Sequence, residues 1–220
     1  MRENPSLSRI PFGRSFYYKE TDIELGGGII SSMGFHQSLK PTAQGLSMCI
    51  DYKVIPLQLP VKVPKFLEEH LDLKFNANTS LNDKEWKRVE ADLKELKVTV
   101  IHQKTSHKYV VAGLTPDISN NMKFENDKDS KRMVSVVEYF REIHGEEVEH
   151  KRLPCLDLTK NKRLNYVPME FRVLVEEQRY PIESLHWNEA LKIREKALIT
   201  LPNLKEAIYE MIKDKDGPCG

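Results

Sequence analysis

The spacing of apolar residues changes at Lys97, and this change constrains the fold more than any other feature of the chain. Before it, apolar residues recur at intervals of three and four, which predicts one buried face of a helix. Those residues are Trp86, Val89, Leu93 and Leu96. After it, residues 97–102 and 108–114 alternate with a period of two, which predicts a β-hairpin. Both periods in one stretch predict a mixed α+β domain.

The first third of the chain has strand character. Residues 29–59 contain alternating apolar and polar runs, and prolines at 56, 60 and 64 punctuate their end. The triplet Gly26-Gly27-Gly28 lacks the Gly-Lys-Ser/Thr ending of a phosphate-binding loop, so we expect a structural turn there. We therefore predict a β-ribbon linker over residues 1–60, ahead of a separate domain.

Further helices and strands are predicted downstream of Lys97. Residues 121–125 indicate a short strand. Ser135 and Glu138 form a capping box that opens a helix, and Gly145 is placed to end it. The expected buried side of that helix consists of Val136, Val137, Phe140 and Ile143. Residues 153–158 and 166–169 return to strand character, and two polar helices are expected over 183–199 and 203–213. These patterns predict a domain over 61–180 and a helical linker over 181–220.

Composition excludes several classes of function. The chain has 34 Lys and Arg against 33 Asp and Glu, so no global positive field draws it to nucleic acid, and any such contact must be a local pocket. Cys49, Cys155 and Cys219 form no CxxC pair, which argues against a disulfide framework or a zinc module. We expect no metal, no cofactor and no membrane contact. The apolar core of a signal peptide is absent from the N-terminus, so a cytoplasmic protein, also present in the nucleus, is expected.

Aromatic, histidine and basic residues gather in the middle stretch and suit the capture of one nucleic-acid strand end. Aromatic faces stack on bases, and Tyr, Lys, Arg and His donate hydrogen bonds to phosphates. Each residue alone is ordinary, because a single tyrosine is more often core and a basic loop is more often solvated. The candidate RNA-binding residues are His102, His107, Lys108, Tyr109, Phe124, Tyr139, His144, Lys162, Arg163 and Tyr166.

Several ordered pieces of this stretch resemble the PAZ domain of an Argonaute protein. They are Leu96–Val100, Lys108-Tyr109, Glu138-Tyr139-Phe140, Leu153–Leu156, Tyr166–Glu170 and Glu177–Tyr180. Outside them, 13–17, 34–38 and 45–47 are similar to the linker that precedes this domain in plant Argonautes, and 216–220 resembles their second linker. The resemblance covers nearly the whole chain. It implies an OB-like β-barrel with an inserted hairpin-and-helix lobe, preceded by a β-ribbon and followed by helices.

The resemblance also implies a function. PAZ domains of that family hold the 3′ end of a small guide RNA in the cleft between barrel and lobe, and such a pocket tolerates a terminal 2′-O-methyl group. Phe124 would then contact the terminal nucleotide, and Arg163 would contact the RNA backbone. The pocket lining would be His102, Lys108, Tyr109, Tyr139 and Tyr166. The implied partners are a small guide RNA and the remaining Argonaute domains.

Two positions depart from the family pattern. His107 stands where many relatives have arginine, and His144 stands where many have tyrosine near this position. Because histidine is mostly neutral near pH 7, we expect weaker and more pH-dependent end binding.

Three alternatives stay open. They are a Dicer-type PAZ domain, a protein-interaction scaffold whose aromatic residues are core, and an enzyme. In Argonautes the metal-binding carboxylates lie in a later domain, so we expect no catalytic residue in this chain.

Overall fold

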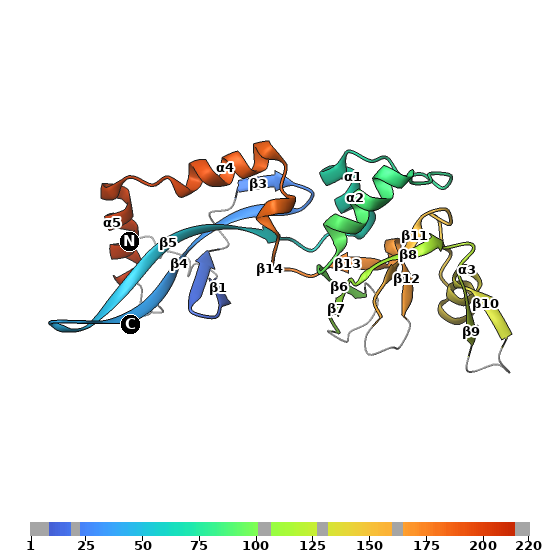
Figure 1. The fold of residues 1–220 in the computed structure, drawn as a ribbon, viewed down its shortest axis with the longest axis horizontal. Helices are drawn as coiled ribbons and strands as arrows, with labels where there is room; N and C mark the ends of the chain where they lie inside the picture. Colours follow the sequence, from blue (N-terminus) through green and yellow to red (C-terminus); the bar gives the residue numbers. More distant parts are fainter. Residues whose placement is uncertain (1–8, 19–22, 101–106, 127–131, 160–164, 214–220) are drawn as a thin grey trace, which may run out of the picture. The chain divides into compact units, whose positions relative to one another are not determined.

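The computed structural model describes residues 9–18, 23–100, 107–126, 132–159 and 165–213 (Figure 1). The chain divides into two compact units. The first contains Met1–Leu25, Ile29–Leu57 and Arg179–Gly220, and the second contains Gly26–Gly28 and Gln58–Gln178. No helix within the described ranges has the length and apolar character needed to cross a membrane. The domain boundaries expected at residues 60 and 180 stay predictions.

The first unit is built on an antiparallel ribbon. Its strands are β1 (Arg9–Phe12), β2 (Ser15–Tyr18), β3 (Ile23–Gly26), β4 (Ile29–Thr42) and β5 (Gly45–Gln58). The sheet order is β1-β2-β4-β5-β14, where β14 is Gln178–Arg179, and β3 pairs separately with β4. The ribbon expected in the first third of the chain is thus confirmed, and β4 and β5 form its long arms (Figure 1).

Two helices complete the first unit. They are α4 (Trp187–Ala197) and α5 (Leu201–Lys213), which follow a 3₁₀ turn at Ile182–Ser184. Met211 of α5 is buried against Tyr18 and Phe35, because the apolar stripe of α5 faces the ribbon. The helical character expected after residue 180 is therefore confirmed.

The three glycines between β3 and β4 form a turn, as expected. Gly26, Gly27 and Gly28 have φ values of 116°, 59° and 72°, a region that side chains disfavour. The carbonyl of Gly28 accepts hydrogen bonds from the Leu59 amide at 2.7 Å and from the Gln58 side chain at 3.2 Å. The glycine turn therefore forms hydrogen bonds with residues 58 and 59 of the same chain.

The second unit begins with α1 (Val63–Leu71) and α2 (Asp83–Leu93). Asn82 caps α2, since its side chain accepts from the amides of Lys84 and Glu85 at 3.0 Å. The Glu85 carboxylate returns a hydrogen bond to the Asn82 amide at 2.9 Å, which completes a capping box. α1 packs against β13 and α2 against β8, so the helices cover the strands described next.

Six strands of the second unit form two antiparallel sheets. One has the order β13-β6-β7 and the other β12-β11-β8. Their bounds are β6 (Lys97–Val100), β7 (Tyr109–Val110), β8 (Gly113–Ile118), β11 (Pro154–Asp157), β12 (Tyr166–Pro168) and β13 (Arg172–Leu174). Together they make a curled antiparallel half-barrel, which confirms the expected mixed class with a barrel-like sheet.

The expectation of one strand over 108–114 was wrong. The Val111 amide donates to the Leu96 carbonyl at 2.9 Å, whereas the next amide, of Ala112, donates to Asp157 at 2.8 Å. Two successive amides therefore bond toward different sheets, and the segment becomes β7 and β8. The alternation of apolar and polar residues continues across the boundary between β7 and β8, so the sequence pattern does not reveal that boundary.

A hairpin-and-helix lobe is inserted between β8 and β11. It consists of β9 (Lys123–Asn126), β10 (Arg132–Ser135), the helix α3 (Val136–Tyr139) and the π-helical turn η1 (Phe140–His144). The inserted lobe is confirmed, but β10 was missed because Ser135 both ends that strand and caps α3. Ile143 was expected on the buried side and is 49% exposed, because the π turn rotates it away from the α-helical stripe.

Candidate functional site

Aromatic rings from four short elements gather around the inserted lobe. Phe124 comes from β9, Tyr139 from α3, Phe140 and His144 from η1, and Phe171 from the 3₁₀ turn η2 (Met169–Phe171). We call these five rings the aromatic cluster. The Phe124 and Tyr139 ring centroids lie 5.1 Å apart, those of Tyr139 and His144 5.6 Å, and Phe140 stacks on Phe171 at 5.1 Å and 13°.

The π turn explains why these rings meet. In a π helix the backbone closes from residue i to i+5, so Tyr139 and His144 fall on the same side. The Gly145 amide donates to the Phe140 carbonyl, and Gly145 has a φ of 68°, which ends the turn. His144 is exposed and the other four rings are partly buried. The cluster is therefore anchored in the fold and still leaves ring surface for a flat ligand.

A second group lies on β7 and β13. The Arg172 guanidinium carbon is 5.6 Å from the centroid of the Tyr109 ring. Burial lowers the pKa of Arg172 below its usual value, and the neighbouring Tyr109 acts in the opposite direction. Lys108 and His107 precede Tyr109 and are both exposed, and the His107 carbonyl accepts from the Thr99 hydroxyl at 3.3 Å. We call Tyr109 and Arg172 the tyrosine–arginine pair.

One continuous segment connects the two groups. Along β12, η2 and β13, Phe171 stacks within the aromatic cluster and the next residue, Arg172, lies over Tyr109. α3 also packs against β12, where Tyr166 is partly buried. Burial, followed by the charge of Asp157 on the neighbouring strand, raises the pKa of Tyr166, so its phenol stays protonated and can donate a hydrogen bond. The segment brings aromatic faces, a phenol and a buried cation into one region.

The structure brings together some of the residues that the sequence singled out. Phe124, Tyr139 and His144 share the aromatic cluster, and Lys108 and His107 adjoin Tyr109. His102, Lys162 and Arg163 lie outside the described residues. The binding roles of all ten residues stay predictions.

Sequence reasoning missed Phe171 and Arg172, and it placed Phe140 only in the core. A signal for Arg172 exists, because the arginine follows Phe171 and precedes the apolar run from 173 to 175, which marks a charge on a strand that should be buried.

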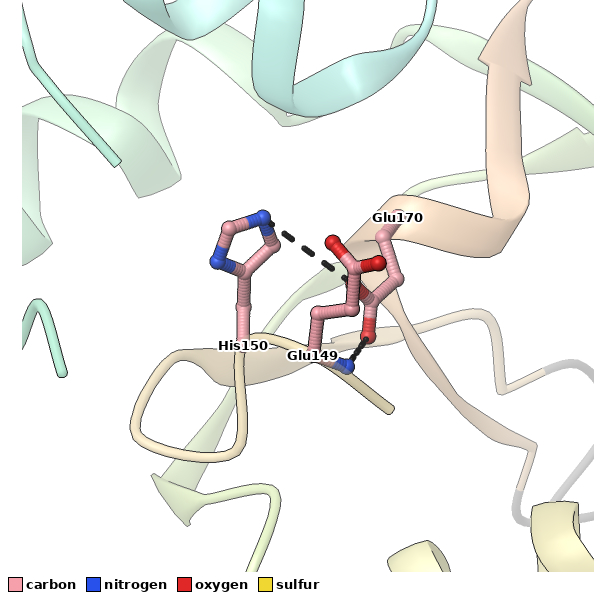
Figure 2. Close-up of side chains that lie close together, drawn as sticks. All are labelled: Glu149, His150 and Glu170. Atoms are coloured by element: carbon pink, nitrogen blue, oxygen red, sulfur yellow. Dashed lines mark hydrogen bonds and ion pairs between the residues drawn. The ribbon is translucent and has the colours of Figure 1, made fainter. Parts of the chain in front are cut away.

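A polar group on the same unit could in principle meet a cation. Glu149, His150 and Glu170 each place a ligand atom within 4.8 Å of the others (Figure 2). One Glu170 oxygen, however, accepts from the Glu149 amide at 3.0 Å, and the other faces His150 Nε2 at 4.0 Å. His150 Nδ1 lies 3.4 Å from the Asn76 carbonyl. We interpret the group as structural, because its contacts hold the loop before β11 against η2.

Cys155 has no nucleophilic role in this arrangement. The residue is fully buried in β11, and its thiol donates to Ser119 at 3.2 Å. Burial raises the pKa of the Cys155 thiol to about 12, so the reactive thiolate is scarce near neutral pH.

Comparison with known proteins identifies the family. A family model described as the PAZ domain matches residues 71–190. The chain belongs to the PAZ domain family. A second model, described as the Argonaute linker 1 domain, matches residues 11–56, which assigns this PAZ domain and its preceding ribbon to the Argonaute proteins. As the PAZ domain of an Argonaute, the chain is a binding module.

Individual relatives agree with this assignment. Protein argonaute 2 of Oryza sativa subsp. japonica is 35% identical over 220 residues, which are 100% of this chain and 21% of that protein. Protein argonaute 7 of Arabidopsis thaliana is 34% identical over 218 residues, 96% of this chain and 22% of that protein. The chain thus spans about a fifth of the length of these curated relatives.

A solved structure has a similar fold. The crystal structure of Kluyveromyces polysporus Argonaute with a guide RNA matches with a TM-score of 0.54 and 14% identity, over 95% of this chain and 25% of that one.

Proposed function

We propose that this PAZ domain anchors the 3′ end of a small guide RNA and performs no chemistry itself. The observation that carries the proposal is the segment that joins the aromatic cluster to the tyrosine–arginine pair, through the adjacent residues Phe171 and Arg172. A nucleotide offers a base that aromatic rings can stack on and a phosphate that a cation or a phenol can bind.

The energetics favour an unpaired strand end. Stacking of a base on an aromatic side chain contributes roughly 1–3 kcal/mol and does not depend strongly on the base. Proteins read unpaired RNA ends more readily than duplex, because only unpaired bases can be splayed onto such side chains. Phosphates accept hydrogen bonds from Tyr and Lys, and Lys108 directly precedes Tyr109, the first residue of the edge strand β7.

Net charge supports a pocket over a general RNA-binding surface. The chain carries a formal charge of +1, so affinity for RNA must come from a few local contacts. We propose the remaining Argonaute domains as the second partner, and the cytoplasm, with the nucleus as a further compartment, as the location. Cleavage of a target strand is a proposal for other domains of the whole protein. The match to the Argonaute linker favours this reading over a Dicer-type PAZ domain.

Substitution of one ring in each group tests the proposal. Tyr139→Ala and Tyr109→Ala should each weaken binding of a short single-stranded RNA by about tenfold or more. A stacked base contributes roughly 1–3 kcal/mol, and a hydrogen bond to a charged phosphate contributes about 1.5–3 kcal/mol. Fluorescence anisotropy with a 5′-labelled RNA measures the affinity, and circular dichroism verifies the fold. Tyr209→Ala is the matched control, because Tyr209 is 58% exposed on α5 of the first unit. Normal RNA binding by both site variants would favour the scaffold alternative.

A further inference from the structure

Arg172 is a buried cation that lacks a counter-charge among the described residues. The residue is 7% exposed, and its Nε atom has no hydrogen-bond partner. Within the described part of the chain no carboxylate acts on its charge, and the Tyr109 ring is its polar neighbour. Burial of an arginine is ordinarily accompanied by a carboxylate or by several acceptors. Arg172 is therefore an unusual residue to keep at this position for stability alone.

Strand register places Arg172 on the same face as Tyr109. In the sheet β13-β6-β7, Leu174 is opposite Val98, and Val98 is opposite Tyr109. Arg172 is two residues from Leu174 along β13, and side chains two apart on a strand share a face. The guanidinium thus lies diagonally across β6 from the phenol and within reach of it. Backbone pairing of the three strands fixes which residues share this face.

An isolated buried charge weakens the folded state unless an anion balances it. A cation over an aromatic face is partly stabilised, but the ring offers no full charge. In exchange, an anion that binds beside Tyr109 meets a cation that is already dehydrated and held in place. Charge-assisted hydrogen bonds to phosphate are stronger than neutral ones, and arginine suits them by its geometry.

We propose that Arg172 is a positioning and charge-supplying residue of the RNA site. Its guanidinium holds the Tyr109 ring in orientation, and its charge is balanced by a phosphate of the bound strand. This inference rests on the proposed function, because the phosphate is that of an RNA end. In this proposal Arg172 strengthens RNA binding and lowers the stability of the RNA-free chain.

The test replaces Arg172 in the full 220-residue chain. Arg172→Met removes the charge and keeps an unbranched, flexible side chain, although a shorter one, and Arg172→Lys keeps the charge. Arg179→Met is the matched control, since Arg179 also lies over tyrosine, 5.7 Å from the Tyr17 ring centroid, but in the first unit. All three variants and the unchanged chain are titrated with 5′-labelled single-stranded RNA over a range of salt, and each is melted.

We expect Arg172→Met to bind RNA about tenfold more weakly, an effect within the range of a desolvated cation contact. The slope of log affinity against log salt should become shallower by about 0.7, the contribution of one phosphate on a single strand. The Tm of the RNA-free variant should be unchanged or higher, because an unbalanced buried charge is gone. Arg172→Lys should recover the slope, and Arg179→Met should bind like the unchanged chain.

Two results would overturn the role of Arg172 and leave the proposed function intact. The first is that the unchanged chain prefers RNA with a free 3′ end, while Arg172→Met has the same RNA affinity and the same salt dependence as the unchanged chain. The second is a lowered Tm in Arg172→Met with an unchanged salt slope, which would make Arg172 a packing residue. A different result, no preference of the unchanged chain for a free 3′ end, would contradict the proposed function itself.

Discussion

Arg172 and Glu170 lie two residues apart and carry opposite charges, yet burial drives both toward their neutral forms. Burial lowers the pKa of Arg172 and raises the pKa of Glu170. The difference lies in their surroundings. Glu170 has the Glu149 amide and the His150 ring, which partly offset its burial, whereas the charge of Arg172 faces the Tyr109 ring. Glu170 therefore has a structural role, whereas the charge of Arg172 is available to a ligand.

Glu170 makes stability depend on pH. Burial is the largest influence on its pKa, and His150 and the Glu149 amide lower it while the Glu149 carboxylate raises it. Because the folded-state pKa exceeds the ordinary value of 4.5, the folded state holds the proton more tightly than the unfolded state. Stability should therefore fall as pH rises from 4.5 through the folded pKa, and then level off.

Glu170→Gln should remove this pH dependence, because the amide oxygen can still accept from Glu149 and carries no charge. Urea unfolding at several pH values measures the effect, and the stability of the variant relative to the unchanged chain should increase with pH. Glu147→Gln removes an exposed charge from the same loop and serves as the control. A constant difference between Glu170→Gln and the unchanged chain at every pH would show that burial does not perturb this carboxyl.

Helices α2 and α3 of the second unit both begin with a capping box, but they position different side chains. Ser135 caps α3 and Asn82 caps α2, each through a capping box with a glutamate three residues later. α3 leads directly into η1 and so places Tyr139, Phe140 and His144. α2 instead buries Val89 and Leu93 in the core. Loss of either cap should therefore affect stability, but only loss of the α3 cap should affect the aromatic cluster.

Ser135→Ala and Asn82→Ala test this difference. Each substitution removes a cap that contributes about 1 kcal/mol. Both variants should unfold at a lower urea concentration, and Ser135→Ala should also bind RNA several-fold more weakly. Anisotropy and urea titration on the same samples separate the two effects. Equal RNA affinities for the two variants would mean that the α3 cap does not support the cluster.

The elements also show what local sequence pattern can and cannot predict. The capping box at Ser135, the glycine turn and the long ribbon are visible in the sequence, because each depends on residues close together in the chain. The break between β7 and β8 is not, because it depends on Leu96 and Asp157, which are distant in sequence from Ala112. The pairing of Arg172 with Tyr109 was missed for the same reason. The π turn was missed because the capping box and the apolar spacing do not distinguish it from a continuing α-helix.

At the scale of the whole molecule, the nearly neutral charge and the few half-buried rings point to one strand end as the ligand. An RNA-coating protein would distribute basic residues widely and would bind internal segments as well as ends. A pocket that closes around a terminus instead requires that terminus to be small. Binding should thus depend on the 3′ end more than on the length or base sequence of the RNA.

The most direct measurement compares one single-stranded RNA with a free 3′-hydroxyl and the same RNA with a bulky group on that hydroxyl. Both are titrated at one salt concentration against the chain, and a third RNA carries the bulky group at its 5′ end. The account predicts that the 3′ block weakens binding at least tenfold, while the 5′ block has little effect. Equal affinities for the free and the 3′-blocked RNA would contradict the account.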